Sequence, residues 1–211
     1  MTKEKMLVTQ ALNELKLIDS RIGTSIVNGN FVSFAKTVEK KVTPNTTKEE
    51  FNIRAKGDYQ SIIALIKRRA IIKAAIVASN AITEVSVNGT VMTVAEAIET
   101  KNSIEYEESL LSALKSQLSM SLSNMNSKNI ALEDKINSYI EQMLGKEAKI
   151  KEDEITGIVT PMRVAGEYSL VDPVDVRKEI EMLDAKISGF KSEVDSALQI
   201  SNCTTMIEFE S

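Results

Sequence analysis

The chain has 211 residues, of which 43% are apolar and 27% are charged, so it is long enough and apolar enough to bury a core. Its net charge of -4 argues against a general nucleic-acid binder, because such proteins usually carry a basic surplus. It contains no histidine, which excludes a Ser-His-Asp triad, a Cys-His pair and any zinc site with histidine ligands.

The rest of the composition favours long helices in a reducing compartment. Aromatic residues make up only 4% of the chain, and 3 prolines and 8 glycines interrupt it. Cys203 is the only cysteine, so no disulfide forms within the chain. The first residues lack an apolar signal segment, and no apolar run reaches the length of a membrane span. We therefore expect a cytoplasmic protein with no membrane partner and no nucleic-acid partner.

The first part of the chain predicts a helix, a strand and a loop. Apolar residues that recur at steps of three and four predict a helix over residues 3–27. The short β-branched segment over residues 31–38 predicts a strand. The polar stretch over residues 40–46 predicts a loop that leads to the next helix.

A second helix is predicted over residues 48–79. Thr47 and Glu50 form a capping box, in which each side chain bonds the backbone of the other residue. The apolar positions of this helix cover more than one stripe: Ile62, Ile63, Leu65, Ile66, Ile71, Ile72, Ile76 and Val77. A helix that is apolar over so much of its circumference is central or is covered by another subunit. We therefore expect the chain to form a homo-oligomer.

A β-hairpin and a third helix follow. Residues 85–92 are predicted to form two strands joined by an Asn88-Gly89 turn. Thr93 and Glu96 form a second capping box, which opens a helix over residues 94–144.

The last part of the chain predicts strands on either side of a fourth helix. Residues 155–171 contain glycine and proline among β-branched residues, which predicts a second strand pair. Asp172 as N-cap and Pro173 at the first helical position predict the start of the last helix. Its apolar residues alternate steps of four and three without a fault, and residues 204–209 predict a final strand.

One phrase occurs twice and suggests an internal repeat. Residues 79–85 (SNAITEV) are echoed by residues 201–207 (SNCTTMI), and each copy links a long helical pattern to β-branched residues. We expect a single elongated domain over residues 1–211, with a pseudo-repeat of residues 1–92 and 93–211. The predicted fold is mostly α: two tandem antiparallel long helical hairpins, making an elongated four-helix bundle, with short strands and a hairpin at the tip.

A basic cluster in the second predicted helix is the first candidate site. Lys67, Arg68 and Arg69 lie in an otherwise apolar stretch, and Arg54 precedes them. Arg69 falls in phase with the apolar stripe, where an unpaired charge is costly and must find an anion. It either pairs with a glutamate of another helix or subunit, or it binds an anionic ligand such as a nucleotide, since guanidinium groups suit phosphates.

The two repeated phrases are the second candidate site. Asn80 and Asn202, together with Thr83, Thr204 and Thr205, either end helices by satisfying local backbone groups or line a binding cleft at the tip. Nothing in the chain has the spacing of a metal site or of a phosphate-binding loop.

These motifs resemble the septicolysin-like family, a group of poorly characterised helical proteins of bacteria and their phages. The resemblance is carried by Asn80, the Asn88-Gly89 turn, the run TVAEAI over residues 93–98 and the run NCTT over residues 202–205. It is firmest over residues 75–118 and 170–207. It implies an elongated helical fold and brings no established activity.

We therefore expect a non-enzymatic, homo-oligomeric helical protein that binds a small anionic ligand without a cofactor or a metal. If the chain is phage-encoded, the resemblance implies that it would sequester a nucleotide immune signal in the host cytoplasm. The alternative is a structural or assembly component of a phage virion. An enzyme is the third class, and the missing histidine argues against it.

Overall fold

A computed structural model describes residues 3–144 and 152–210 of the chain. This part of the chain is mostly helical, as predicted, and carries a few short antiparallel strand pairs. The helices are α1 (Val8–Asn28), α2 (Lys48–Asn80), α3 (Val94–Leu144), α4 (Glu152–Gly166) and α5 (Val176–Thr204). The strands are β1 (Lys3–Leu7), β2 (Lys41–Thr43), β3 (Thr46–Thr47), β4 (Glu84–Val87), β5 (Thr90–Thr93) and β6 (Met206–Glu210).

The chain divides into two compact units. The first unit comprises Met1–Asn102 and Gly189–Ser211, and the second comprises Ser103–Ser188. Helices α3 and α5 each contribute residues to both units.

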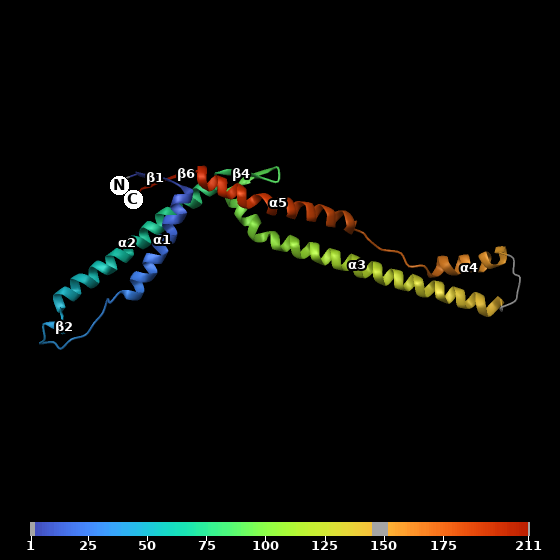
Figure 1. The fold of residues 1–211 in the computed structure, drawn as a ribbon, viewed down its shortest axis with the longest axis horizontal. Helices are drawn as coiled ribbons and strands as arrows, with labels where there is room; N and C mark the ends of the chain where they lie inside the picture. Colours follow the sequence, from blue (N-terminus) through green and yellow to red (C-terminus); the bar gives the residue numbers. More distant parts are fainter. Residues whose placement is uncertain (1–2, 145–151, 211) are drawn as a thin grey trace. The chain divides into compact units, whose positions relative to one another are not determined.

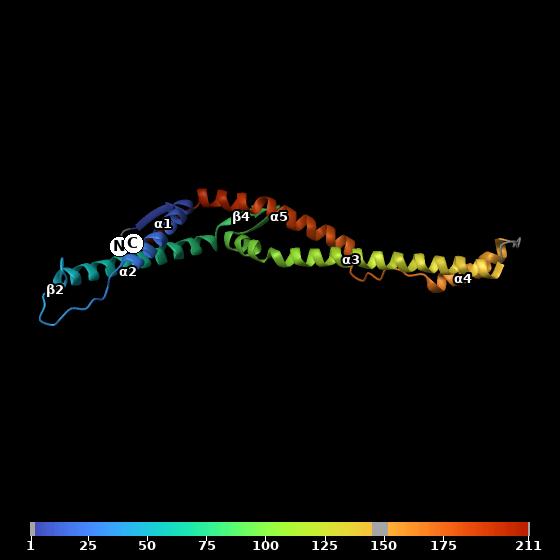
Figure 2. The same cartoon turned by 60° about the horizontal axis from the view of Figure 1, so that its bottom comes forward.

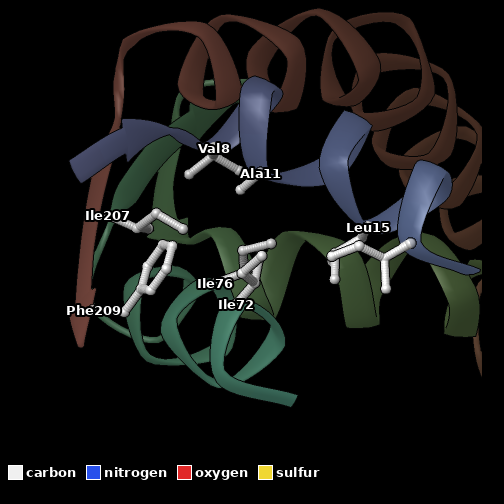
Figure 3. Close-up of a cluster of buried hydrophobic side chains, with 8 residues drawn as sticks. Val8, Ala11, Leu15, Ile72, Ile76, Ile207 and Phe209 are labelled. Carbon is white, nitrogen blue, oxygen red and sulfur yellow. The ribbon is translucent and has the colours of Figure 1, made fainter. Parts of the chain in front are cut away.

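An antiparallel pair of helices, α1 and α2, forms the body of the first unit (Figure 1). One face of α1 and one face of α2 bury apolar side chains against each other and against β6 (Figure 3). The buried members of this cluster are Val8, Ala11, Leu15, Ile18, Ile72, Ile76, Ile207 and Phe209. The predicted three-four spacing of the first helix is confirmed over Val8–Asn28, because the α1 members of the cluster follow that spacing.

The prediction that the first helix begins at residue 3 is wrong. Lys3–Leu7 forms β1, which pairs antiparallel with β6 from the other end of the sequence, Lys3 opposite Glu210 and Leu7 opposite Met206. A partner so distant in the sequence leaves no local signal, so the residues preceding α1 resembled a continuation of its helical pattern.

The predicted hairpin and both predicted capping boxes are confirmed. β4 and β5 pair antiparallel around Asn88 and Gly89, whose φ angles of 49° and 72° lie in the left-handed region that this two-residue turn requires. Thr47 opens α2 through Glu50, and the α3 box has the same pattern of bonds. The structure also confirms the predicted starts of the long helices, Lys48 for α2 and Val94 for α3, and α2 ends at Asn80, one residue after its predicted end.

Helix α3 pairs with two successive segments of the second unit. The Arg163 guanidinium of α4 donates to both carboxylate oxygens of Glu133 on α3, at 2.6 and 2.8 Å. Lys115 and Lys186 form further ion pairs, between α3 and α5, each at 2.7 Å. Figures 1 and 2 show α4 lying along α3 in both views.

The predictions for the segment between α1 and α2 are wrong. Residues 31–38 form no strand, because no other segment of the described chain lies in register to pair with them. The predicted loop over residues 40–46 instead contains β2 and part of β3, which pair with each other. The β-branched run over residues 31–38 was therefore a poorer predictor of strands than the turn between Thr43 and Thr46, which brings β2 and β3 together.

The predicted strand pair over residues 155–171 is also wrong. Most of this segment belongs to α4, with Pro161 inside the helix, and residues 167–171 have no regular structure. Val159 is buried and Arg163 bonds α3, so tertiary contacts outweigh the turn signals of glycine and proline. The predicted start of the last helix at Asp172 is displaced: α5 begins at Val176, whose N–H donates to the Asp172 carboxylate at 2.9 Å.

Candidate functional site

The two repeated phrases form two helix exits with the same backbone bonds. At the end of α2, the Thr83 N–H donates to the Ser79 carbonyl at 2.9 Å, and the hydroxyls of these residues lie 3.4 Å apart. At the end of α5, the Thr205 N–H donates to the Ser201 carbonyl at 2.9 Å, and those hydroxyls lie 3.5 Å apart. The repeat in the sequence thus marks a repeat in local geometry.

Each exit is also tied to the start of another helix. The Thr83 carbonyl accepts from the Val94 N–H of α3 at 2.8 Å, and the Thr205 carbonyl accepts from the Val8 N–H of α1 at 3.0 Å. Between the bonded ends lie the strand pairs β4–β5 and β6–β1. The first unit therefore contains the same helix–strand pair–helix arrangement twice, once closed by the Asn88-Gly89 turn and once formed by the two ends of the described chain.

A groove of about 510 Å³ runs along one of these arrangements, between β4 and α5. It lies wholly within the first unit. Its lining consists of Thr83, Glu84, Val85, Ser86, Ser192, Glu193, Ser196, Ala197, Ile200, Ser201, Thr204 and Thr205. Three of the five residues predicted to line a cleft at the tip, Thr83, Thr204 and Thr205, belong to this lining. A volume of this size is in the range of small-molecule sites.

The chemistry of the groove is that of hydroxyl groups and carboxylates. Serine and threonine supply seven of the lining residues, Glu84 and Glu193 supply two carboxylates, and no lysine or arginine belongs to the lining. Hydroxyl groups both donate and accept hydrogen bonds, whereas carboxylates only accept. The groove therefore suits a neutral or cationic molecule rich in hydrogen-bond donors.

The hairpin turn is docked onto α5 at one end of the groove. The Asn88 N–H donates to Glu193 Oε2 at 2.6 Å. One helical turn before Glu193, a Cβ at Gly189 would lie 2.5 Å from Asn88 Nδ2, so the glycine allows the turn to approach the helix closely. Glu193 and Gly189 together fix the distance between β4 and α5.

The two central arginines of the basic cluster are paired with carboxylates of the same chain. Arg68 donates to Glu14 Oε1 at 2.6 Å and to both carboxylate oxygens of Glu4, at 2.9 and 2.8 Å. Arg69 donates to Asp19 at 2.5 Å. Hydrogen bonds to Glu4 and then to Glu14 raise the pKa of Arg68, and the bond to Asp19 raises the pKa of Arg69. An ion pair with another helix was one of the two interpretations of the cluster, although the partner of Arg69 is an aspartate and not the predicted glutamate.

The other predicted site residues lie apart from the groove lining. Arg54 and Lys67 are exposed on α2, and neither makes an ion pair among the residues that the structure describes. Asn80 and Asn202 are half-buried near the ends of α2 and α5. The structure thus brings the threonines of the two exits together and leaves these four residues outside the cavity.

The α5 face of the groove was missed, although the repeat carried a signal for it. Counting back from Ser79 and Ser201, the positions nine, eight and five residues earlier are Ala70, Ile71 and Ala74 on α2. The matching positions on α5 are Ser192, Glu193 and Ser196, which line the groove. A comparison of the two helices, not only of their last turns, would have marked the polar face.

Two further site types are not found. Among residues 3–144 and 152–210, no three His, Cys, Asp or Glu side chains gather as metal ligands would. Within the same residues, every helix is too short or too polar to cross a membrane. Comparisons with protein-family models, with curated proteins and with solved structures found no match to the chain.

Proposed function

We propose that the protein is a non-catalytic binding protein that holds a small ligand in the groove between β4 and α5. The observation that carries the proposal is the convergence of both helix exits on one cavity of about 510 Å³ lined by serine and threonine. A catalytic role would need a group poised for proton transfer or nucleophilic attack, and the groove offers hydroxyl groups with no base bonded to them.

The charge of the groove favours a neutral or cationic ligand. The anionic ligand expected from the sequence would face two carboxylates and no cation there. Such a ligand would need the exposed cations Arg54 and Lys67 instead, or would have to displace the carboxylates from Arg68 and Arg69. An anionic ligand, a nucleotide included, stays a prediction for the α2 surface.

Native mass spectrometry of the purified chain tests the proposal. We expect a retained small molecule that is lost from Ser196→Phe, because the new ring would fill the groove from an exposed position of α5. The matched control is Gln199→Phe, which adds the same ring to the same helix outside the lining. Equal retention in both variants, or no bound molecule in the unmodified chain, would count against this function.

We also propose that the chain works as a homo-oligomer of tandem antiparallel helical hairpins. Support for the hairpins comes from the packing of α1 on α2 and from ion pairs between α3 and α5. Support for the oligomer comes from apolar side chains that α2 leaves exposed: Ile53, Tyr59, Ile66, Ile71 and Val77.

A structural or assembly component, such as a virion part, is the second candidate. It is favoured by the extended segment that joins α1 to α2, where Val32, Phe34 and Val38 are 85%, 94% and 90% exposed. Apolar side chains this exposed favour association with another surface. Sedimentation velocity separates the candidates: a discrete small oligomer fits a binding protein, whereas concentration-dependent growth into large assemblies fits a structural component.

A further inference from the structure

One edge of the β4–β5 hairpin is free. The hairpin is a two-stranded sheet, so each strand has a single strand neighbour. The pair Val87–Thr90 closes the two-residue turn and exchanges backbone hydrogen bonds. Because bonded and non-bonded pairs alternate along an antiparallel ladder, the N–H and C=O groups of Glu84 and Ser86 point away from β5.

The free edge faces α5 across the groove. Asn88 continues the same alternation, and its N–H points to α5, where it donates to Glu193 at 2.6 Å. Glu84 and Ser86 both line the groove, and in the described chain no hydrogen bond outside the β4–β5 ladder involves their backbone groups. The groove therefore presents a row of backbone donors and acceptors in addition to its side-chain hydroxyls.

The opposite wall could hold the far side of an extended chain. Ser192, Ser196 and Ile200 recur at steps of four along α5, so they lie on one face of the helix and line the groove together. Two hydroxyls and one aliphatic side chain in a row offer both polar and apolar contacts to the side chains that an extended peptide turns toward α5.

We infer that the groove takes an extended, basic peptide segment that pairs with the free edge of β4, an inference that rests on the proposed function and names its ligand class. Strand addition supplies the backbone bonds that Glu84 and Ser86 lack. The carboxylates of Glu84 and Glu193, with no cation in the lining, select a lysine or arginine side chain on the peptide.

Peptide pools applied to the full chain test the inference. The probes are acetylated, amidated short peptides of random sequence in a basic, a neutral and an acidic pool, and affinity selection with mass spectrometry identifies those retained. We expect retention from the basic pool, and amide hydrogen exchange of Glu84 and Ser86 that slows at least about tenfold when the tightest peptide is bound.

Paired proline variants test the edge itself. Ser86→Pro removes an N–H that β5 does not use, so the hairpin is kept while strand addition is blocked, and peptide affinity falls at least about tenfold. Val91→Pro is the matched control, because Val91 lies opposite Ser86 and its N–H points to the other edge of the hairpin. We expect it to change affinity less than about threefold, and circular dichroism confirms that both variants keep their helices.

The outcomes separate this inference from the proposed function. If peptides bind without slowing exchange at Glu84 and Ser86, or if Val91→Pro weakens binding as much as Ser86→Pro, strand addition is wrong. If no pool binds and a small molecule is still lost from Ser196→Phe, the peptide inference fails and the small-molecule function stands. If neither peptide nor small molecule depends on the groove, both fail.

Discussion

The two helix exits of the first unit share their backbone bonds and differ in the surfaces they carry. In both, a serine–threonine turn leads to a strand, and a buried valine and alanine open the next helix: Val8 and Ala11 in α1, Val94 and Ala97 in α3. The helix faces beside the strands differ: α2 carries alanine and isoleucine where α5 carries serine and glutamate. The bonded turn and the buried pair therefore set the local fold, and the exposed face is free to acquire a separate role.

The two helices also differ eleven residues before Ser79 and Ser201, the serines of the two exits. There α2 has Arg68, which bonds Glu4 and Glu14 and lies 5.8 Å from the centre of the Phe209 ring, whereas α5 has the buried Phe190. One arrangement is thus held by an ion network and the other by an aromatic side chain.

The largest effect that we predict follows from the ion network. Arg68→Met removes three hydrogen bonds to the half-buried carboxylates Glu4 and Glu14, so we expect the free energy of unfolding to fall by about 2–3 kcal/mol. Arg69→Met is the control, because the Arg69–Asp19 pair is more exposed and should contribute less than about 1 kcal/mol. Urea unfolding measures both. Equal losses would contradict this difference between the two arginines, and losses under about 1 kcal/mol in both variants would show that neither is a structural anchor.

The next effect depends on pH, because the N3 residue at the start of α3 is ionisable and its counterpart in α1 is not. The Glu96 carboxylate accepts from the Thr93 N–H at 2.7 Å, whereas the Gln10 amide oxygen accepts from the Leu7 N–H at 3.1 Å. Hydrogen bonds from the Thr93 backbone and then from its hydroxyl lower the pKa of Glu96. The folded chain therefore binds this proton less readily than the unfolded chain, so the contribution of Glu96 is present above the unfolded pKa and is lost as the pH falls through the folded one.

The matched variant replaces the N3 residue of one helix start with that of the other. Glu96→Gln gives α3 the N3 side chain that α1 has, and we expect it to lower stability at pH 7 and to have a smaller effect as the pH falls through the folded pKa of Glu96, where the carboxylate becomes protonated. Urea unfolding of the two proteins at several pH values measures the difference. A constant difference between pH 7 and pH 3 would mean that the carboxylate charge is irrelevant to this cap.

How much the sequence revealed depended on how local each cause was. The Asn88-Gly89 turn, the Thr47 and Thr93 boxes and the start of α3 follow from residues within a few positions, and all were predicted. β1 was missed because its partner, β6, lies at the other end of the sequence. α4 was missed because its stability comes from contacts with α3 that override glycine and proline.

The candidate site was foreseen only in part, for the same reason. Thr204 and Thr205 belonged to the repeated phrase and lie in the groove, whereas Ser192, Glu193 and Ser196 lie in an otherwise regular heptad and stand out only when α5 is compared with α2. Glu193 gains its role only when the hairpin turn approaches, through the close contact that Gly189 permits.

The smallest effect that we predict concerns the equivalence of the two strand pairs. A permuted chain begins at Gly89, ends at Asn88 and joins Glu210 to Lys3 through a short linker. In this chain the β6–β1 pair is closed by a linker, and the β4–β5 pair is formed by the two chain ends. Because Lys3 lies opposite Glu210 and the bonds at Thr83 and Thr205 match, we expect its free energy of unfolding to stay within about 1 kcal/mol of the original. A permutant with the same linker that is opened at Gly57, inside α2, should lose far more, since it interrupts a helix. Urea unfolding followed by far-UV circular dichroism compares the three chains. If the Gly89 permutant were as unstable as the Gly57 permutant, the two exits would share their hydrogen bonds without being interchangeable. The polar face of α5 could then not be explained as a difference in surface residues between two equivalent helix–strand pair–helix arrangements.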